Sequence, residues 1–295
     1  MHLMTLPVLE VSSTGYAAFG AVFMLILGAA LAAILAMAGK FFKVEADPRV
    51  EQIIELLPGV NCGGCGFGGC AAYAEAIVAK GVAANLCAPG REAVAANIAR
   101  VMGGKAEAVE AQAAVVHCGG GNKAARKAAD YYGVQTCRGT SVPGLNSPKA
   151  CLYGCLGFGD CVRACPFGAM VMGEDGLPQV LESLCVACGK CVAACPRNII
   201  ALHSKKCHVH VLCKNRDVGR EVTRVCEVGC IACRKCEKAC PSDAIHVVDN
   251  LAVIDYAKCT SCGKCAEECP QSIIVNWKQV RQELEKLQPA AAGKA

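Results

Sequence analysis

Residues 259–270 read CTSCGKCAEECP, and the spacing of their thiols, C-x2-C-x2-C-x3-C-P, recurs at 185–196 and at 230–241. A stretched form, CLYGCLGFGDCVRACP, occupies 151–166. Three thiolates on one tight loop can bind three corners of an iron–sulfur cubane. The proline after the fourth cysteine lacks a backbone donor, so that cysteine does not simply continue a hydrogen-bonded segment. We therefore expect the fourth thiol of each run to point to a neighbouring cluster and the runs to work in pairs.

The same spacing is found in bacterial two-cluster ferredoxins, where the fourth cysteine of each run binds the other cluster. Pairing the runs in sequence order predicts four [4Fe–4S] clusters in two ferredoxin-like units. The first unit would use two sets, Cys151, Cys155, Cys161 and Cys195, and Cys165, Cys185, Cys188 and Cys191. The second unit would use Cys230, Cys233, Cys236 and Cys269, and Cys240, Cys259, Cys262 and Cys265. Zinc sites are the alternative, but their C-x2-C pairs are usually separated by a dozen or more residues.

A further set of thiols lies upstream, in NCGGCGFGGC at 61–70 and at Cys87. Glycines flank these thiols because the loop must wrap a cluster closely and aim backbone N–H groups at sulfur. We expect Cys62, Cys65, Cys70 and Cys87 to bind one more [4Fe–4S] cluster, with a zinc site as the alternative. The chain would then hold at least five clusters.

An internal repeat relates the two ferredoxin-like units. When the units are aligned on their C-P ends, the cysteines of 151–165 match those of 226–240, and Phe158 stands where the second unit has Cys233. Cys151 is expected to replace the missing thiol, and a three-iron cluster would form if it cannot reach. Five cysteines remain: Cys118, Cys137, Cys207, Cys213 and Cys226. They are either thiols that bind no metal and pack as small apolar residues, or Cys118, Cys137, Cys213 and Cys226 bind a sixth cluster.

The 295 residues include 25 cysteines but only 5% aromatic residues. Large apolar cores are therefore not expected, and bound clusters would supply folding free energy. The formal charge of +5 falls to roughly −5 with five clusters of about −2 each, so no nucleic-acid partner is expected. No strand is followed by G-x-G-x-x-G, which predicts no nicotinamide or flavin site. We expect no catalytic or hydride-transfer residue in this chain.

Residues 15–38 contain no charged side chain, and as a helix they would span about 36 Å, enough to cross a bilayer. The run is too long for the apolar region of a signal peptide, and no Lys or Arg precedes it. Lys40, Lys43 and Arg49 follow it, so the positive-inside rule places the N-terminus outside and the rest of the chain in the cytoplasm. We expect a single-pass protein of the cell inner (plasma) membrane with a cytoplasmic C-terminal domain.

The predicted fold class is α+β. We expect an N-terminal segment at 1–14, a transmembrane helix at 15–39, a small helical [4Fe–4S] domain at 44–90, a helical linker at 91–117, tandem two-cluster ferredoxin-like units at 118–204 and 205–276, and a C-terminal helix and tail at 277–295. β-hairpins are predicted inside the units, most clearly at 244–254 around the turn Asp249-Asn250. His208 and His210 alternate as in a strand and are expected at the surface.

These motifs in this order closely resemble the B subunit of the Rnf complex, the ion-translocating ferredoxin:NAD oxidoreductase of prokaryotic membranes. The resemblance rests on one membrane helix, on CGGCG-x3-C at 62–70 with Cys87, and on GCLG-x-GDCV-x-ACPF at 154–167. It covers nearly the whole chain, and the second unit at 207–275 is similar to the longer form of the family. The resemblance implies an electron-transfer subunit that accepts electrons from soluble reduced ferredoxin and relays them to other membrane and peripheral subunits.

Residues 197–238 carry ten basic side chains against four acidic ones. This excess favours either a face that steers an acidic electron carrier or a solvated surface that balances cluster charge. Two other functions fit the residues. One is a membrane-bound polyferredoxin of another oxidoreductase complex, such as a hydrogenase, which co-purifying subunits would reveal. The other is a zinc or metal-storage protein, which would lack the visible absorption and EPR signals of iron–sulfur clusters.

Overall fold

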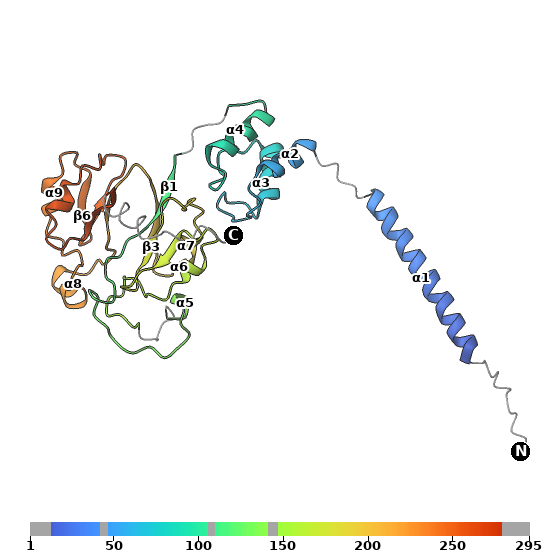
Figure 1. Ribbon diagram of the computed structural model, residues 1–295, viewed down its shortest axis with the longest axis horizontal. Coiled ribbons are helices and arrows are strands. Elements are labelled where there is room, and N and C mark those ends of the chain that lie inside the picture. The colour runs from blue at the N-terminus through green and yellow to red at the C-terminus, as the bar shows by residue number, and fades with distance from the viewer. Residues whose placement is uncertain (1–12, 42–46, 106–109, 141–146, 279–295) are drawn as a thin grey trace, which may run out of the picture. The chain divides into compact units, whose positions relative to one another are not determined.

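The structure, a computed structural model, describes residues 13–41, 47–105, 110–140 and 147–278 (Figure 1). The chain divides into two compact units, Met1–Pro48 and Arg49–Ala295. In the first, helix α1 (Ser13–Phe41) contains the apolar stretch Phe19–Ala38, which has a mean hydropathy of 2.6 and is long enough to cross a membrane. The predicted apolar helix is confirmed. Most of the predicted N-terminal segment and of the predicted C-terminal helix and tail lies outside the described residues.

Three helices, α2 (Pro48–Leu56), α3 (Cys70–Lys80) and α4 (Arg91–Val101), form the small domain that follows. The first of them begins with a proline, whose fixed φ suits the first turn of a helix. Ile53, Tyr73 and Ile98 come from different helices, are at most 1% exposed, and belong to one core. The predicted linker at 91–117 is therefore not one element. Its helix α4 packs within this small domain, and residues Gln112–Val116 form a strand of the next domain.

Each ferredoxin-like unit contains two separate two-stranded antiparallel sheets. In the first unit, β2 (Met170–Met172) pairs with β3 (Pro178–Val180), and β1 (Gln112–Val116) pairs with β4 (Ile200–Ser204). In the second unit, β6 (Ile245–Val248) pairs with β7 (Leu251–Ile254), and β5 (Val209–Val211) pairs with β8 (Ile274–Asn276). The β2–β3 and β6–β7 pairs are the hairpins that the turn residues indicate. The other pairs join the first strand of each unit to its last strand, which ties the two ends of the unit together.

Short helices carry the cysteine runs. Within the first unit α6 (Asp160–Arg163) contacts α7 (Lys190–Ala194), and within the second unit α9 (Lys235–Ala239) contacts α10 (Lys264–Glu267). Two more, α5 (Cys137–Thr140) and α8 (Gly219–Val225), precede the first run of each unit. The cores are small and mix aliphatic side chains with thiols, as Ile200 with Cys161 in one unit and Ile245 with Cys236 in the other. Most thiols of the runs therefore face inward, whereas Cys233 and Cys262 are exposed.

Histidines meet where the two ferredoxin-like units join. His117, which follows β1, donates from Nδ1 to the carbonyl oxygen of Val211 (2.8 Å), and its Nε2 lies 2.9 Å from Nε2 of His203. His210 in β5 is fully buried, and its Nδ1 lies 2.9 Å from the hydroxyl of Tyr256. The prediction that His210 lies at the surface is wrong, because successive residues of β5 are all buried and both of its faces are therefore covered,.

Candidate iron–sulfur sites

The three regular cysteine runs share one backbone conformation. The residues on either side of the second cysteine have positive φ in every case: Ala187 and Gly189, Ala232 and Arg234, and Ser261 and Gly263. For a residue other than glycine, this left-handed conformation costs roughly 1–2 kcal/mol. Successive backbone N–H groups in such turns converge and form a concavity that binds anions. The conformation therefore suits a loop that surrounds thiolate and sulfide.

In the second unit the structure brings together both predicted sets of cysteines. One hollow is lined by Cys230, Cys233, Cys236 and Cys269, and another by Cys240, Cys259, Cys262 and Cys265. Burial first, and then the neighbouring thiols, raise the pKa of Cys236 to about 12 and that of Cys265 to about 11. Such thiols resist ionisation in water-free surroundings, but a bound metal takes the place of the proton. Both sets therefore fit the thiolate ligation of an iron–sulfur cluster.

The first unit differs from the prediction in one cysteine. Cys165 lies with Cys185, Cys188 and Cys191, as predicted, and after burial these neighbouring thiols raise the pKa of Cys191 to about 11. The other hollow is lined by Cys155, Cys161 and Cys195 together with Cys137, not Cys151. Burial and then the thiols of Cys155 and Cys137 raise the pKa of Cys161 to about 12, which also marks Cys137 as a neighbour.

The loop that lacks a cysteine keeps the shape of a cluster-binding loop. Gly157 and Gly159, on either side of Phe158, have φ of 85° and 74°, like the residues around the second cysteine of the regular runs. The ring of Phe158 packs against Tyr131, with 5.6 Å between centroids. The loop is thus built for a cluster but supplies one ligand too few.

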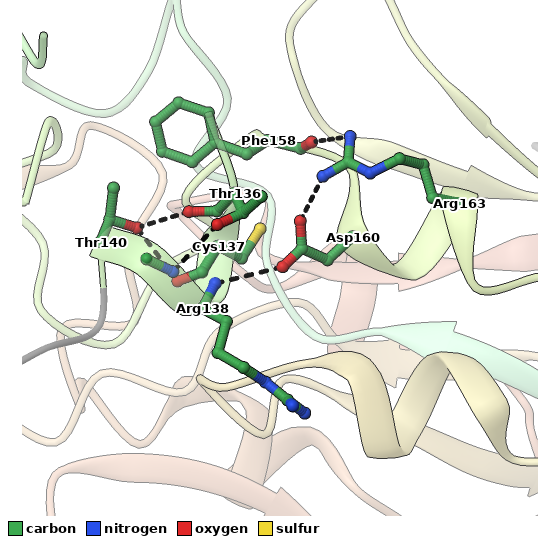
Figure 2. A network of polar contacts seen from close by, with 8 residues as sticks. Thr136, Cys137, Arg138, Thr140, Phe158, Asp160 and Arg163 are labelled. Atoms are coloured by element: carbon green, nitrogen blue, oxygen red, sulfur yellow. Dashed lines mark hydrogen bonds and ion pairs between the residues drawn. The ribbon is translucent and has the colours of Figure 1, made fainter. Parts of the chain in front are cut away.

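Helix α5 brings Cys137 to this loop (Figure 2). The Asp160 carboxylate accepts a hydrogen bond from the backbone N–H of Arg138 (3.1 Å) and pairs with Arg163. Arg163 also donates to the carbonyl oxygen of Phe158 (2.8 Å). One carboxylate therefore fastens the residue after Cys137 to the loop that lacks a thiol. The sequence carries no spacing signal for this, since Cys137 stands outside every run.

The small domain brings together the remaining predicted set, since Cys62, Cys65, Cys70 and Cys87 line one hollow. Asn61 closes the loop, because its Oδ1 accepts a hydrogen bond from the backbone N–H of Cys70 (2.8 Å). Gly69 must lack a side chain, since a Cβ there would lie 2.9 Å from the same Oδ1. The glycines of this motif are therefore used for close backbone approach, as the sequence indicates.

Tyr73 supports the last ligand of that set. Its hydroxyl donates to the carbonyl oxygen of Ala83 (2.7 Å) and accepts from the backbone N–H of Leu86 (3.1 Å). Burial raises the pKa of this hydroxyl to about 12, so it stays protonated. These two hydrogen bonds fix the segment that leads into Cys87.

A further hollow is lined by a sixth group of cysteines, Cys118, Cys151, Cys213 and Cys226. The predicted sixth set had Cys137 in place of Cys151, so the structure exchanges these two cysteines between the sets. Cys207 is buried and lines none of these hollows, although Cys259 is near enough to add to the effect of burial in raising its pKa. The six groups of four contain every other cysteine of the chain. In the described ranges, no three His, Cys, Asp or Glu side chains are arranged to hold a single metal ion.

Sets of four thiols on ferredoxin-type loops define a protein with several [4Fe–4S] clusters. An Fe-S cluster family model matches residues 57–89. Models of the 4Fe-4S dicluster domain match 150–200, 184–244 and 223–281. The middle match joins the last run of one unit to the first run of the next, whereas the structure pairs the runs in order within each unit.

Three relatives extend the comparison beyond single domains. The chain is 48% identical over 232 residues to the B subunit of the ion-translocating oxidoreductase complex of Methanosarcina acetivorans, covering 79% of this chain and 88% of that one. It is 47% identical over 235 residues to the B subunit of the proton-translocating ferredoxin:NAD(+) oxidoreductase complex of Clostridium ljungdahlii, with 79% and 82% covered. It is 45% identical over 224 residues to the Na(+)-translocating counterpart of Acetobacterium woodii, with 76% and 67% covered. The chain belongs to this family, the B subunits of ion-translocating oxidoreductase (Rnf) complexes.

Proposed function

We propose that this chain is the membrane-anchored electron relay of an ion-translocating ferredoxin:NAD oxidoreductase complex, and that it takes electrons from reduced ferredoxin and passes them to other subunits. The observation that carries the proposal is that adjacent cysteine groups share their short helices. A [4Fe–4S] cluster bound by four thiolates supplies one-electron transfer at low potential. The chain's own residues hold these groups in a fixed series.

The spacing between neighbouring groups is set by one helical turn. Across α6, Cys161 belongs to one group and Cys165 to the next, and α7 separates Cys191 from Cys195 in the same way. Four residues of helix rise about 6 Å. The second unit repeats this arrangement across α9 and α10. Two groups that exchange ligands over one turn are held close together, which favours electron transfer between them.

Backbone N–H groups and aliphatic side chains adjust the surroundings of the thiols. The N–H groups of Ala114 and Ala244 donate to Sγ of Cys185 (3.5 Å) and Cys240 (3.3 Å). Hydrogen bonds to cluster ligands and solvent exposure are the main means by which proteins set cluster potentials. The fully buried Val209 beside the second-unit site keeps water away from it.

Electrons would enter where a thiol is near the surface and basic side chains surround it. Cys233 is exposed, and the neighbouring Arg234, Lys235 and Lys238 carry the charge of this face. Arg234 is partly compensated by Glu237 (3.8 Å), as Arg216 is by Asp249 (2.9 Å), whereas no ion pair of Lys235 or Lys238 is found among the described residues. An acidic ferredoxin would be steered to the face around Cys233, because opposite charges raise the rate of encounter.

The membrane anchor would be α1, with Lys40 and Lys43 on its C-terminal side. Positive residues mark the cytoplasmic end of a span, so the cysteine-bearing part of the chain is proposed to lie in the cytoplasm, where ferredoxin is found.

The test uses the complex purified anaerobically in detergent, with reduced ferredoxin as donor and visible bleaching as readout. A Lys235→Glu/Lys238→Glu variant should slow the reduction by roughly tenfold at low ionic strength and flatten its salt dependence. Lys80→Glu/Lys123→Glu, which makes the same charge change at exposed positions elsewhere, is the control. An unchanged rate in the first variant would contradict docking at this face. A wild-type complex that dithionite reduces but ferredoxin does not would contradict the proposed function.

A further inference from the structure

The hollow lined by Cys118, Cys151, Cys213 and Cys226 has the internal symmetry of the repeat. Cys118 follows β1 by two residues, and Cys213 follows β5 by two residues. The Sγ of Cys118 accepts a hydrogen bond from the backbone N–H of Cys155 (3.2 Å), and the Sγ of Cys213 accepts one from the N–H of Cys230 (3.5 Å). Cys155 and Cys230 begin equivalent loops of the two units. The two thiols therefore occupy the same position in each unit.

The other two thiols obey the same symmetry. Cys151 stands four residues before Cys155, and Cys226 stands four residues before Cys230. Cys226 is joined to the first unit by a β-bridge to Ala125 and lines the same hollow as Cys118 and Cys151. Each unit thus contributes one thiol after its first strand and one before its first cluster loop.

Two glycines let the backbone approach these sulfur atoms. A Cβ added to Gly120 would lie 3.1 Å from Sγ of Cys226 and 3.8 Å from Sγ of Cys118. A Cβ added to Gly154 would lie 3.4 Å from Sγ of Cys151 and 3.6 Å from Sγ of Cys118. The sulfur atoms of Cys226 and Cys118 thus lie on either side of one Cβ position, and those of Cys151 and Cys118 on either side of the other. The two sulfur atoms of each pair are therefore near enough to bind adjacent corners of one cubane. Side chains at either position would intrude among the thiols.

Two buried polar side chains, Asn215 and Lys149, also line this hollow. Asn215 is 2% exposed, and its Nδ2 lies 3.7 Å from Sγ of Cys151 while its backbone N–H donates to Sγ of Cys213 (3.5 Å). Lys149 is 7% exposed, donates to the carbonyl oxygen of Gly120 (3.0 Å), and forms none of the ion pairs found among the described residues. A buried ammonium is costly unless an opposite charge lies nearby.

We propose that Cys118, Cys151, Cys213 and Cys226 bind a sixth [4Fe–4S] cluster at the junction of the two ferredoxin-like units, two ligands from each, while Cys137 completes the first-unit site. The cluster's formal charge of about −2 compensates Lys149, and the amide and backbone donors face its thiolates. Its ligands accept hydrogen bonds from the loops of Cys155 and Cys230. The inference rests on the proposed relay and extends it, since this site joins the series of one unit to that of the other.

Iron content of the anaerobically purified full chain in its complex is the first test. Six clusters predict about 24 iron and 24 acid-labile sulfide per chain, and five predict about 20. A wild-type value of about 20 would overturn the sixth cluster. If a protein with about 20 iron were still reduced by ferredoxin, the proposed relay would stand without the sixth cluster. If a protein with about 24 iron were not reduced by ferredoxin, the relay would be contradicted and the sixth cluster would stand.

Pairs of substitutions then test which thiols act together. Cys118→Ala with Cys151→Ala should lose about four iron in total, because both changes remove the same cluster, whereas Cys151→Ala with Cys161→Ala should lose about eight. If Cys151 instead belonged with Cys161, these two results would be reversed and the assignment would fail. Cys207→Ala, at the one cysteine outside the six groups, is the matched control and should keep all iron. Mössbauer spectra of the same samples give the cluster count without depending on activity.

Discussion

Tyr73→Phe should loosen the small domain and release its cluster first. The side chain is 1% exposed, and its hydroxyl makes two hydrogen bonds, to the carbonyl oxygen of Ala83 and from the N–H of Leu86. Phenylalanine keeps the ring in the core but leaves both backbone groups without this partner. A buried polar group without a partner costs about 1–3 kcal/mol. Because the segment can relax toward water after Leu86, we expect a net loss of about 2 kcal/mol.

That loss converts into a rate of iron release. Iron leaves such a site when the domain opens locally, and the population of the open form follows the local free energy of opening. A loss of about 2 kcal/mol raises that population by about 30-fold. The detergent-solubilised complex would be mixed anaerobically with excess chelator, and iron release would be followed over time. The variant should show a fast phase of about four iron per chain, with the remaining iron released at the wild-type rate.

Tyr132→Phe is the matched control, since Tyr132 is 94% exposed and lies outside the small domain. It should release iron as the wild type does. If Tyr73→Phe showed no fast phase, the hydroxyl would not support the Cys87 segment in the way the hydrogen bonds indicate. If all clusters were lost together, the small domain would not open independently of the ferredoxin-like units.

Three further predictions test other parts of the structure. Gly120→Ala places a Cβ 3.1 Å from Sγ of Cys226 and should make the junction site lose about four iron to a chelator, whereas Gly104→Ala, which meets nothing within 4 Å, should lose none. Phe158→Cys should restore the iron that Cys137→Ala removes, because the loop around Phe158 already has the required backbone; continued loss in the double variant would refute this. Burial, then His117 and Lys214, lower the pKa of His203 to about 4. His203 therefore binds a proton near pH 6.5 in the unfolded state but only near pH 4 in the folded state. The free energy of unfolding should fall as the pH is lowered through that range. His203→Gln should flatten the fall in thermal midpoint, and His246→Gln, at a partly exposed site, should not.

The grouping of cysteines that share one run was predictable because the spacing is local. The second-unit sets follow directly from C-x2-C-x2-C-x3-C-P, and the positive φ of Ala232 and Ser261 is the backbone cost of that spacing. The hairpins were predictable for the same reason, since the turn Asp249-Asn250 lies between two apolar strands, and both turn residues have positive φ.

The exchange of Cys137 and Cys151 was not predictable from spacing, because it depends on contacts between distant segments. Cys137 reaches its site through Asp160, 22 residues away along the chain from Arg138. The repeat did contain a signal, since Cys151 aligned with Cys226 and so belonged with the left-over thiols of the second unit. The prediction instead placed Cys151 with Cys155, because the two are only four residues apart in the sequence. His210 was misplaced for a similar reason, because strand alternation indicates one exposed face only where no second unit covers it.

The junction explains why a site of this kind escapes a search for motifs. One ferredoxin-like unit contains only two of its thiols, so no single run shows a complete set, and the four come together only when both units are present. The same contacts hold the units to each other: the N–H of Gly119 donates to the carbonyl oxygen of Leu212 (2.8 Å), and that of Arg126 donates to Val225 (2.9 Å). Each of these bonds lies beside a junction cysteine. The bonds that hold the units together are thus made by chain neighbours of the proposed ligands, so a change that weakens the interface is expected to weaken the relay with it.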